Sequence, residues 1–271
     1  MSNLLGKSAL VTAAGSGIGR ATAITLAARG ARVMVSDISF DAAQKVADEI
    51  RDAGGNAATT VCDIGEEEQI AGTIRKTVET FGKLDILHNN AALLIPEIFA
   101  EDVDILTIST EAWDLTMKVT LRGTMLGCRY AVKEMLKTGG GSIINTSSMY
   151  GVSAFYRQTA YGVAKGAINT LTEYVATSFG RQNIRCNAVA PSMIRTPIVE
   201  EVIPDALIRL NEDSILLPFM GVPQDIANIV AFLASDDSRY LTGHVFRADG
   251  GSTAHLATYA DARRFYDGTE T

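Results

Sequence analysis

The sequence predicts one α/β domain with a Rossmann-like, doubly wound sheet of seven parallel strands and helices on both faces. Short apolar runs rich in β-branched residues alternate with longer stretches in which apolar residues recur every three or four positions. This alternation is typical of βαβ units, and continuously apolar strands are expected in a parallel sheet that is covered on both faces. No Pro/Ser-rich linker or internal repeat divides residues 1–271, so we expect a single domain.

The expected elements follow in chain order. We predict strands at residues 8–12, 31–36, 57–62, 84–88, 141–146, 184–189 and 244–248. Helical periodicity predicts helices at residues 20–29, 41–53, 66–81, 111–137 and 158–180. Three segments stand outside this alternation. They are an inserted loop at about 93–110, a candidate substrate lid at about 193–220, and a C-terminal tail at 252–271.

Composition narrows the classes of partner. The chain has 24 basic and 31 acidic side chains and a net charge of −7, which disfavours binding to a nucleic-acid backbone. Cys62, Cys128 and Cys186 are odd in number and far apart, so we expect reduced thiols rather than a disulfide framework or a metal site. The N-terminus has no signal-peptide pattern, and no apolar run is suited to a bilayer. We therefore expect a cytoplasmic protein with no membrane partner.

A glycine-rich turn, TAAGSGIG at residues 12–19, follows the first expected strand. Glycines there let the backbone approach a pyrophosphate, and the next helix offers free N–H groups. Asp37 ends the second strand, where its carboxylate would accept hydrogen bonds from the adenosine ribose and repel a 2′-phosphate. No basic residue stands at Ser16 or directly after Asp37, so NAD is favoured over NADP. Asp37 could instead cap the next helix, but Ser39 is better placed to do so.

Tyr161 and Lys165, in the segment YGVAK, lie four residues apart at the start of an expected helix and therefore on one face. A tyrosine needs roughly 3–4 kcal/mol of phenolate stabilisation to act as a base near neutral pH. A lysine ammonium at about 4 Å supplies roughly that amount at an effective dielectric near 20. The other interpretation is an exposed pair that stacks on the helix surface.

These motifs resemble those of the short-chain dehydrogenase/reductase family, and the resemblance covers almost the whole chain. The family's TGxxxGxG turn appears here with Ala13 in place of its first glycine. The remaining matches occur in the family's order: Asp63 and Ile64, NNAA at 89–92, Ser148, YGVAK at 161–165, Pro191 and Ser192 followed by Thr196, and DGG at 249–251.

The resemblance implies which residues bind the cofactor and which act on the substrate. It implies dinucleotide contacts from Ala13, Gly15, Ser16, Gly17, Ile18, Gly19, Asp37, Ile38, Cys62, Asp63, Ile64, Asn90, Ala91, Ala92, Tyr161, Lys165, Pro191, Ser192, Ile194 and Thr196. It also implies an NAD-dependent oxidoreductase, without a metal, that acts on CH–OH donors and uses Tyr161 as general acid/base. Ser148 would hydrogen-bond the substrate oxygen, and Lys165 would lower the pKa of Tyr161 and hold the nicotinamide ribose.

One position departs from the family pattern in a way that bears on proton transfer. The family usually has Asn in an NxxG pattern, whereas this chain has Thr120 in TLRG. The threonine hydroxyl has fewer donors than the amide but can still bind water. We therefore expect Thr120 to support a proton relay to Lys165.

The substrate and the assembly are less closely specified. Apolar residues in the lid, together with Met149, Tyr150 and Phe155, favour a hydrophobic, cyclic or aromatic secondary alcohol or ketone, although they could equally pack the lid onto the domain. Helices 111–137 and 158–180 are apolar on more than one face, and with the resemblance they predict a homotetramer. The alternative function is a low-turnover dinucleotide-binding protein that acts as a sensor or assembly subunit. His88, His244 and His255 lack ligand spacing, and we expect them to be structural or surface residues.

Overall fold

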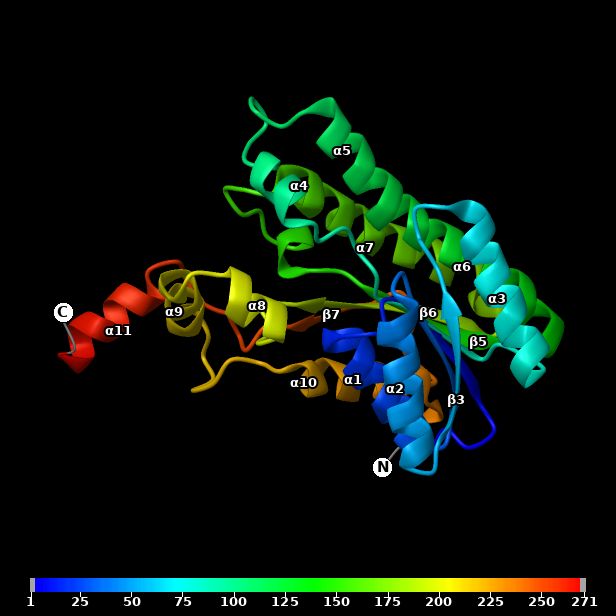
Figure 1. Cartoon of the computed structure of the whole chain (residues 1–271). Coiled ribbons are helices and arrows are strands. Elements are labelled where there is room, and N and C mark those ends of the chain that lie inside the picture. Colours follow the sequence, from blue (N-terminus) through cyan, green and yellow to red (C-terminus); the bar gives the residue numbers. More distant parts are fainter. Residues whose placement is uncertain (1–2, 269–271) are drawn as a thin grey trace.

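Seven strands form one all-parallel sheet in the order β3-β2-β1-β4-β5-β6-β7 in the computed structural model, which describes residues 3–268 (Figure 1). The predicted sheet is confirmed, and each predicted strand agrees with the observed one to within two residues at either end. The strands are β1 (Ser8–Val11), β2 (Arg32–Asp37), β3 (Asn56–Val61), β4 (Ile86–Asn89), β5 (Gly141–Thr146), β6 (Ile184–Pro191) and β7 (Val245–Ala248).

Helices cover both faces of the sheet, and successive side chains of β1 show how. Ala9 and Val11 pack toward α1 (Gly17–Ala28), α2 (Phe40–Asp52) and α10 (Pro223–Ala234). Leu10 packs toward α3 (Glu67–Phe81), α6 (Gly123–Thr138) and α7 (Thr159–Phe179). Because both faces of each central strand are buried, its sequence is apolar without alternation.

The expected helix 111–137 is not regular. It consists of α5 (Thr110–Thr116), the π-helical segment η1 (Met117–Arg122) and then α6. The hydroxyl of Thr124 donates to the carbonyl of Thr120 at 2.8 Å, and such side-chain bonds compete with the regular helical pattern. Thr120 therefore lies in the one irregular stretch of this helix, and π-helical turns frequently occur at functional sites.

The remaining segments carry short helices. The 93–110 segment contains α4 (Pro96–Glu101), the 193–220 segment contains α8 (Pro197–Val202) and α9 (Asp205–Ser214), and the C-terminal segment contains α11 (Tyr259–Asp267). Residues 269–271 of the predicted tail lie outside the described residues. Single 3₁₀ turns, η2, η3 and η4, occur at Met149–Gly151, Gly180–Gln182 and Asp236–Ser238. None of the described helices is both long and apolar enough to cross a membrane.

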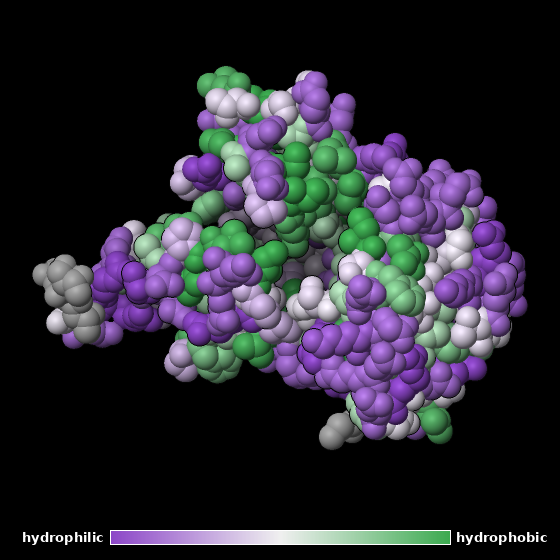
Figure 2. Space-filling model, viewed as in Figure 1, coloured by the Kyte–Doolittle hydropathy of each residue, from purple (hydrophilic) through white to green (hydrophobic). Residues whose placement is uncertain are grey.

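The order of the strands reverses between β1 and β4. From β1 the chain proceeds outward to β2 and β3, and from β4 it proceeds in the opposite direction to β5, β6 and β7. Ligands of open α/β sheets bind beyond the carboxyl ends of the strands at such a switch point. Figure 2 shows the surface hollowed between α8 and the α4–α5 region, with hydrophobic side chains on the rim of the hollow.

Candidate functional site

The glycine-rich turn connects β1 to α1 at this switch point. Helix α1 begins at Gly17, earlier than the predicted residue 20, so the last glycines of the motif form the first helical turn. A side chain on Gly19 would place its Cβ 2.0 Å from the carbonyl oxygen of Ala13, so only glycine fits there. Ala13 itself has φ 49°, in the left-handed region that the family's glycine adopts without strain.

Two polar side chains hold this turn in place. The carboxylate of Asp37 accepts the backbone N–H of Gly15 at 2.9 Å, while the side chain of Asn90 donates to the carbonyls of Thr12 and Ala13. Ser39 caps α2 by accepting the N–H of Ala42, which confirms that the cap is not Asp37. The ends of β1, β2 and β4 are thereby joined around the turn.

The segment after β6 reaches the same turn. Thr196 caps α8 by accepting the N–H of Val199 at 3.3 Å, and its methyl carbon lies 3.6 Å from where a Cβ on Gly17 would be. Pro191 and Ile194 are buried, and Ser192 donates its N–H to the carbonyl of Ala248. The structure therefore brings Thr196 beside the glycine-rich turn, as a dinucleotide site requires.

The other predicted cofactor residues differ in how far their side chains are exposed to solvent. Ile38 is exposed, Cys62 is buried, and Ile64 packs against the core. Asp63 accepts the N–H of Gly65, and Ala91 donates its N–H to the hydroxyl of Thr12. Ser16 is exposed, while Ile18 and Ala92 are partly buried.

Ser148, Tyr161 and Lys165 come together beyond the carboxyl end of β5. The Ser148 hydroxyl hydrogen-bonds the Tyr161 phenol, and Lys165 Nζ lies 5.6 Å from the centre of the Tyr161 ring. The Lys165 ammonium donates to the carbonyl of Thr146 at 2.7 Å. Lys165 is only 1% exposed, so the Thr146 carbonyl replaces water as its partner.

Burial dominates the electrostatics of this pair. It raises the pKa of Tyr161 to about 12, and the hydrogen bond from Ser148 opposes this rise without overcoming it. It also lowers the pKa of Lys165 to about 7. The chain by itself therefore does not bring the pKa of Tyr161 toward neutral, because desolvation of the phenol has the largest effect on it. The lowering expected from Lys165 stays a prediction.

Thr120 is fully buried at the π-helical segment. Its hydroxyl accepts the backbone N–H of Leu93 at 3.1 Å, which ties the helix to the chain just after β4. That contact leaves the hydroxyl proton of Thr120 free to donate. Its part in a proton relay stays a prediction.

Aromatic rings from two segments enclose Tyr161. The ring of Phe99, in α4, lies 5.3 Å from that of Tyr161, and the ring of Tyr150 lies 6.2 Å away on edge. Phe155 stacks on Tyr150 at 4.8 Å. Sequence reasoning identified Tyr150 and Phe155 but missed Phe99, because no local pattern shows which part of the 93–110 segment contacts the helix.

Two further polar residues of the site were not assigned a role from sequence. Asp102, 2% exposed, accepts the N–H groups of Ala160 and Tyr161. In the sequence, the one indication of this role is that Gln158, at the N-cap position of α7, is not a residue that normally caps a helix. His88 was expected to be structural or surface-exposed, and it is fully buried with Nε2 2.9 Å from the hydroxyl of Thr146. Burial and the charge of Lys165 lower the pKa of His88 to about 3, so it is neutral there.

The described residues contain no group of three or more His, Cys, Asp or Glu side chains that could hold a metal ion. A dinucleotide fits the site better than a metal does. Side chains at Gly15 and Gly19 would collide with Ala42, Asp37 and the backbone of Ala13, so glycine at these positions lets the turn pack tightly at the start of α1. This turn lies at a helix N-terminus, where free N–H groups bind phosphate oxygens.

Comparison with known proteins agrees with this geometry. Residues 12–253 match the family model described as enoyl-(acyl carrier protein) reductase. A probable short-chain type dehydrogenase/reductase of Bradyrhizobium diazoefficiens is 40% identical over 261 residues, which cover 96% of this chain and 92% of the relative. The cyclohexanol dehydrogenase of an Acinetobacter species is 37% identical over 248 residues, which cover 92% and 95% of the two chains.

Solved structures of dehydrogenases also superpose closely on this chain. A 7α-hydroxysteroid dehydrogenase complexed with NADH and 7-oxo glycochenodeoxycholic acid superposes with a TM-score of 0.86 at 33% identity, covering 92% of this chain and 95% of that one. A short-chain type dehydrogenase/reductase from Mycobacterium ulcerans superposes with a TM-score of 0.88 at 29% identity, covering 97% and 96%.

Proposed function

Because the chain belongs to the short-chain dehydrogenase/reductase family, and two of the relatives above are a cyclohexanol dehydrogenase and a 7α-hydroxysteroid dehydrogenase, we propose that it is an NAD-dependent alcohol dehydrogenase or ketone reductase. The observation that carries this proposal is the grouping of Ser148 and Tyr161 above the buried Lys165, beside the glycine-rich turn.

In the proposed reaction the cofactor would supply the hydride chemistry, and residues of the chain transfer the proton. When bound at the glycine-rich turn and Thr196, a nicotinamide dinucleotide would supply hydride transfer to or from the alcohol carbon. The hydroxyl proton of the alcohol passes to the phenol oxygen of Tyr161, while the Ser148 hydroxyl holds the substrate oxygen. Since burial alone raises the pKa of Tyr161 to about 12, a positive charge in the filled site has to favour the phenolate.

The proposed substrate is a hydrophobic, cyclic secondary alcohol or the matching ketone. Phe99, Tyr150 and Phe155 form an aromatic wall beside Tyr161. In the proposed lid, residues 193–220, apolar side chains remain about half exposed, which supports a role in covering a ligand rather than only in packing: Ile198, Val202, Leu207, Leu216 and Phe219. The names of two relatives, a cyclohexanol dehydrogenase and a 7α-hydroxysteroid dehydrogenase, agree with this class.

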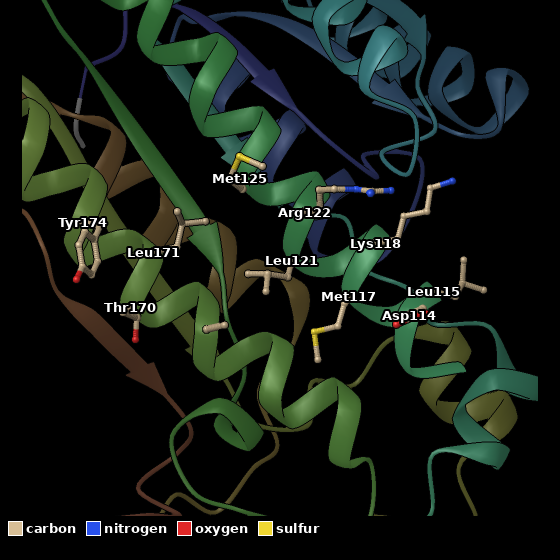
Figure 3. A pocket seen from close by; sticks show the side chains of 11 residues that line it. Asp114, Leu115, Met117, Lys118, Leu121, Arg122, Met125, Thr170, Leu171 and Tyr174 are labelled. Carbon is tan, nitrogen blue, oxygen red and sulfur yellow. The ribbon is translucent and has the colours of Figure 1, made fainter. Parts of the chain in front are cut away.

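We further propose that the protein works in the cytoplasm and as a homotetramer. Cys62, Cys128 and Cys186 are free and buried, which is consistent with a reducing compartment. The outer faces of α5, η1, α6 and α7 border an open groove of about 920 Å³. Figure 3 shows side chains of the η1–α6 stretch and of α7 lining this groove, among them Leu121, Met125 and Leu171. Such a groove suits a second copy of the chain.

The reaction class is tested by NADH formation across a panel of secondary alcohols. We expect turnover with cyclohexanol or a hydroxysteroid and little with ethanol. Tyr161→Phe should lower kcat by about 10²–10⁴-fold, because it removes the proton acceptor, and should leave the Kd for NADH within twofold. Tyr174→Phe, an exposed tyrosine of the same helix, is the control and should be unchanged. Dinucleotide binding without turnover would favour a sensor or assembly subunit instead.

The cofactor preference follows from Asp37. Its carboxylate should repel the 2′-phosphate of NADP, a like-charge contact that costs several kcal/mol, so kcat/KM should be higher with NAD. Asp37→Ala should reduce this preference by at least about tenfold. Asp41→Ala, which removes an exposed carboxylate from the first turn of α2, should preserve it. A wild-type preference for NADP would contradict the assignment.

The relay at Thr120 is tested in two directions. Thr120→Val should lower kcat about fivefold, the equivalent of about 1 kcal/mol for one lost donor in a hydrated path, and Thr120→Asn should preserve or raise it. Thr77→Val removes another buried helical hydroxyl, which donates to the carbonyl of Thr73 in α3, and should leave kcat within twofold. An unchanged rate in Thr120→Val would remove the relay role and leave Tyr161 untouched.

The assembly is tested by light scattering at micromolar concentration, where we expect a tetramer. Leu121→Asp puts a charge into the apolar groove and should yield smaller species, because a buried unpaired charge is costly. Leu5→Asp, at a position 78% exposed near the N-terminus, should remain tetrameric. A monomeric wild-type protein would rule out this proposal.

A further inference from the structure

Helix α7 starts without a capping side chain of its own. Gln158 occupies the N-cap position with φ 57° and ψ 53°, in the left-handed region, and its side chain makes no capping hydrogen bond. The first N–H groups of a helix have no partner within the helix, and Ser, Thr, Asp or Asn normally accepts one of them from the N-cap. This helix carries both Tyr161 and Lys165, so the acceptor of its first turn matters for the site.

Asp102 supplies what Gln158 lacks, from 58 residues earlier in the chain. Its Oδ1 accepts the N–H of Ala160 and its Oδ2 accepts the N–H of Tyr161, both at 3.0 Å. Its backbone carbonyl accepts the N–H of Gln158 at 2.8 Å. A single residue thus accepts the N–H groups of three of the four residues 158–161, and a carboxylate at a helix N-terminus also interacts favourably with the helix dipole.

The same segment contacts the side chain of Tyr161. Asp102 ends α4, donating its own N–H to the carbonyl of Ile98, and α4 carries Phe99, whose ring packs 5.3 Å from that of Tyr161. Asp102 is 2% exposed, so water cannot readily take over its three bonds. The 93–110 segment therefore contacts Tyr161 twice, through a hydrogen bond to its backbone and through packing against its ring.

Lys165 is held by other contacts. Its ammonium donates to the carbonyl of Thr146, and its own carbonyl accepts the hydroxyl of Ser147 at 3.1 Å. Loss of Asp102 would release the first turn of α7 while these bonds keep the next turn in place. The two halves of the Tyr161–Lys165 pair are thus positioned by independent parts of the fold.

We propose that Asp102 is the positioning residue of Tyr161, which fixes the first turn of α7 and thereby aims the phenol at the substrate oxygen. The expected effect on kcat rests on the proposed function, whereas the expected effect on the first turn of α7 rests on hydrogen bonding alone. It gives the inserted segment a task in catalysis that is separate from shaping the mouth of the site.

The kinetic test compares three variants. Asp102→Ala should lower kcat by about ten- to a hundredfold, because small displacements of a reacting group are costly, with the Kd for NADH within twofold because Lys165 and the glycine-rich turn are untouched. Asp102→Asn keeps a capping oxygen and should recover most of the loss. Asp104→Ala is the matched control, since that carboxylate caps only Leu106 and Thr107 within its own turn, and should stay within twofold of wild type.

Hydrogen exchange of the peptide 158–165 gives a readout that needs no turnover. Its amides should exchange about tenfold faster in Asp102→Ala, and at the wild-type rate in Asp104→Ala. If wild type oxidises no alcohol, the proposed function falls, and exchange still decides whether Asp102 fixes the first turn. Unchanged exchange in Asp102→Ala, unchanged kcat in an active enzyme, or equal losses in Asp104→Ala would each overturn the proposal.

Discussion

The hydrogen bond from the Lys165 ammonium to the carbonyl of Thr146 is the interaction around which the site is built. A buried amine needs a partner, and the carboxyl end of β5 supplies one at 2.7 Å. Helix α7 packs on the sheet face that includes Leu10, and this bond ties its second turn to the carboxyl end of β5. Ser148 is the second residue after β5, which places it close to Tyr161.

Thr146 links the two halves of the site. Its carbonyl holds Lys165, while its hydroxyl meets His88 Nε2 at 2.9 Å and the side-chain oxygen of Asn90 at 3.4 Å. The amide group of Asn90 in turn donates to the carbonyls of Thr12 and Ala13 in the glycine-rich turn. A continuous set of hydrogen bonds therefore joins the glycine-rich turn to Lys165, across the carboxyl ends of β1, β4 and β5.

The electrostatic balance of the chain alone disfavours a phenolate. Burial raises the pKa of Tyr161 and lowers that of Lys165, and the carboxylate of Asp102 adds a negative charge next to the N-terminus of α7. The fold thus supplies geometry: a buried phenol, the Ser148 hydroxyl beside it and an aromatic wall.

The sequence alone determined the strands and the helices α1, α2, α3 and α7, because these depend on local patterns. Apolar runs specify strands buried on both faces, the glycines of 12–19 specify a close backbone approach, and the spacing of Tyr161 and Lys165 specifies one helix face. Only the tertiary structure decided the rest. The π-helical segment at Thr120 and the cap from Asp102 depend on partners tens of residues away. The direction of the Tyr161 pKa depends on desolvation. Neither a hydrogen-bond partner at that distance nor the loss of water has a local signature in the chain.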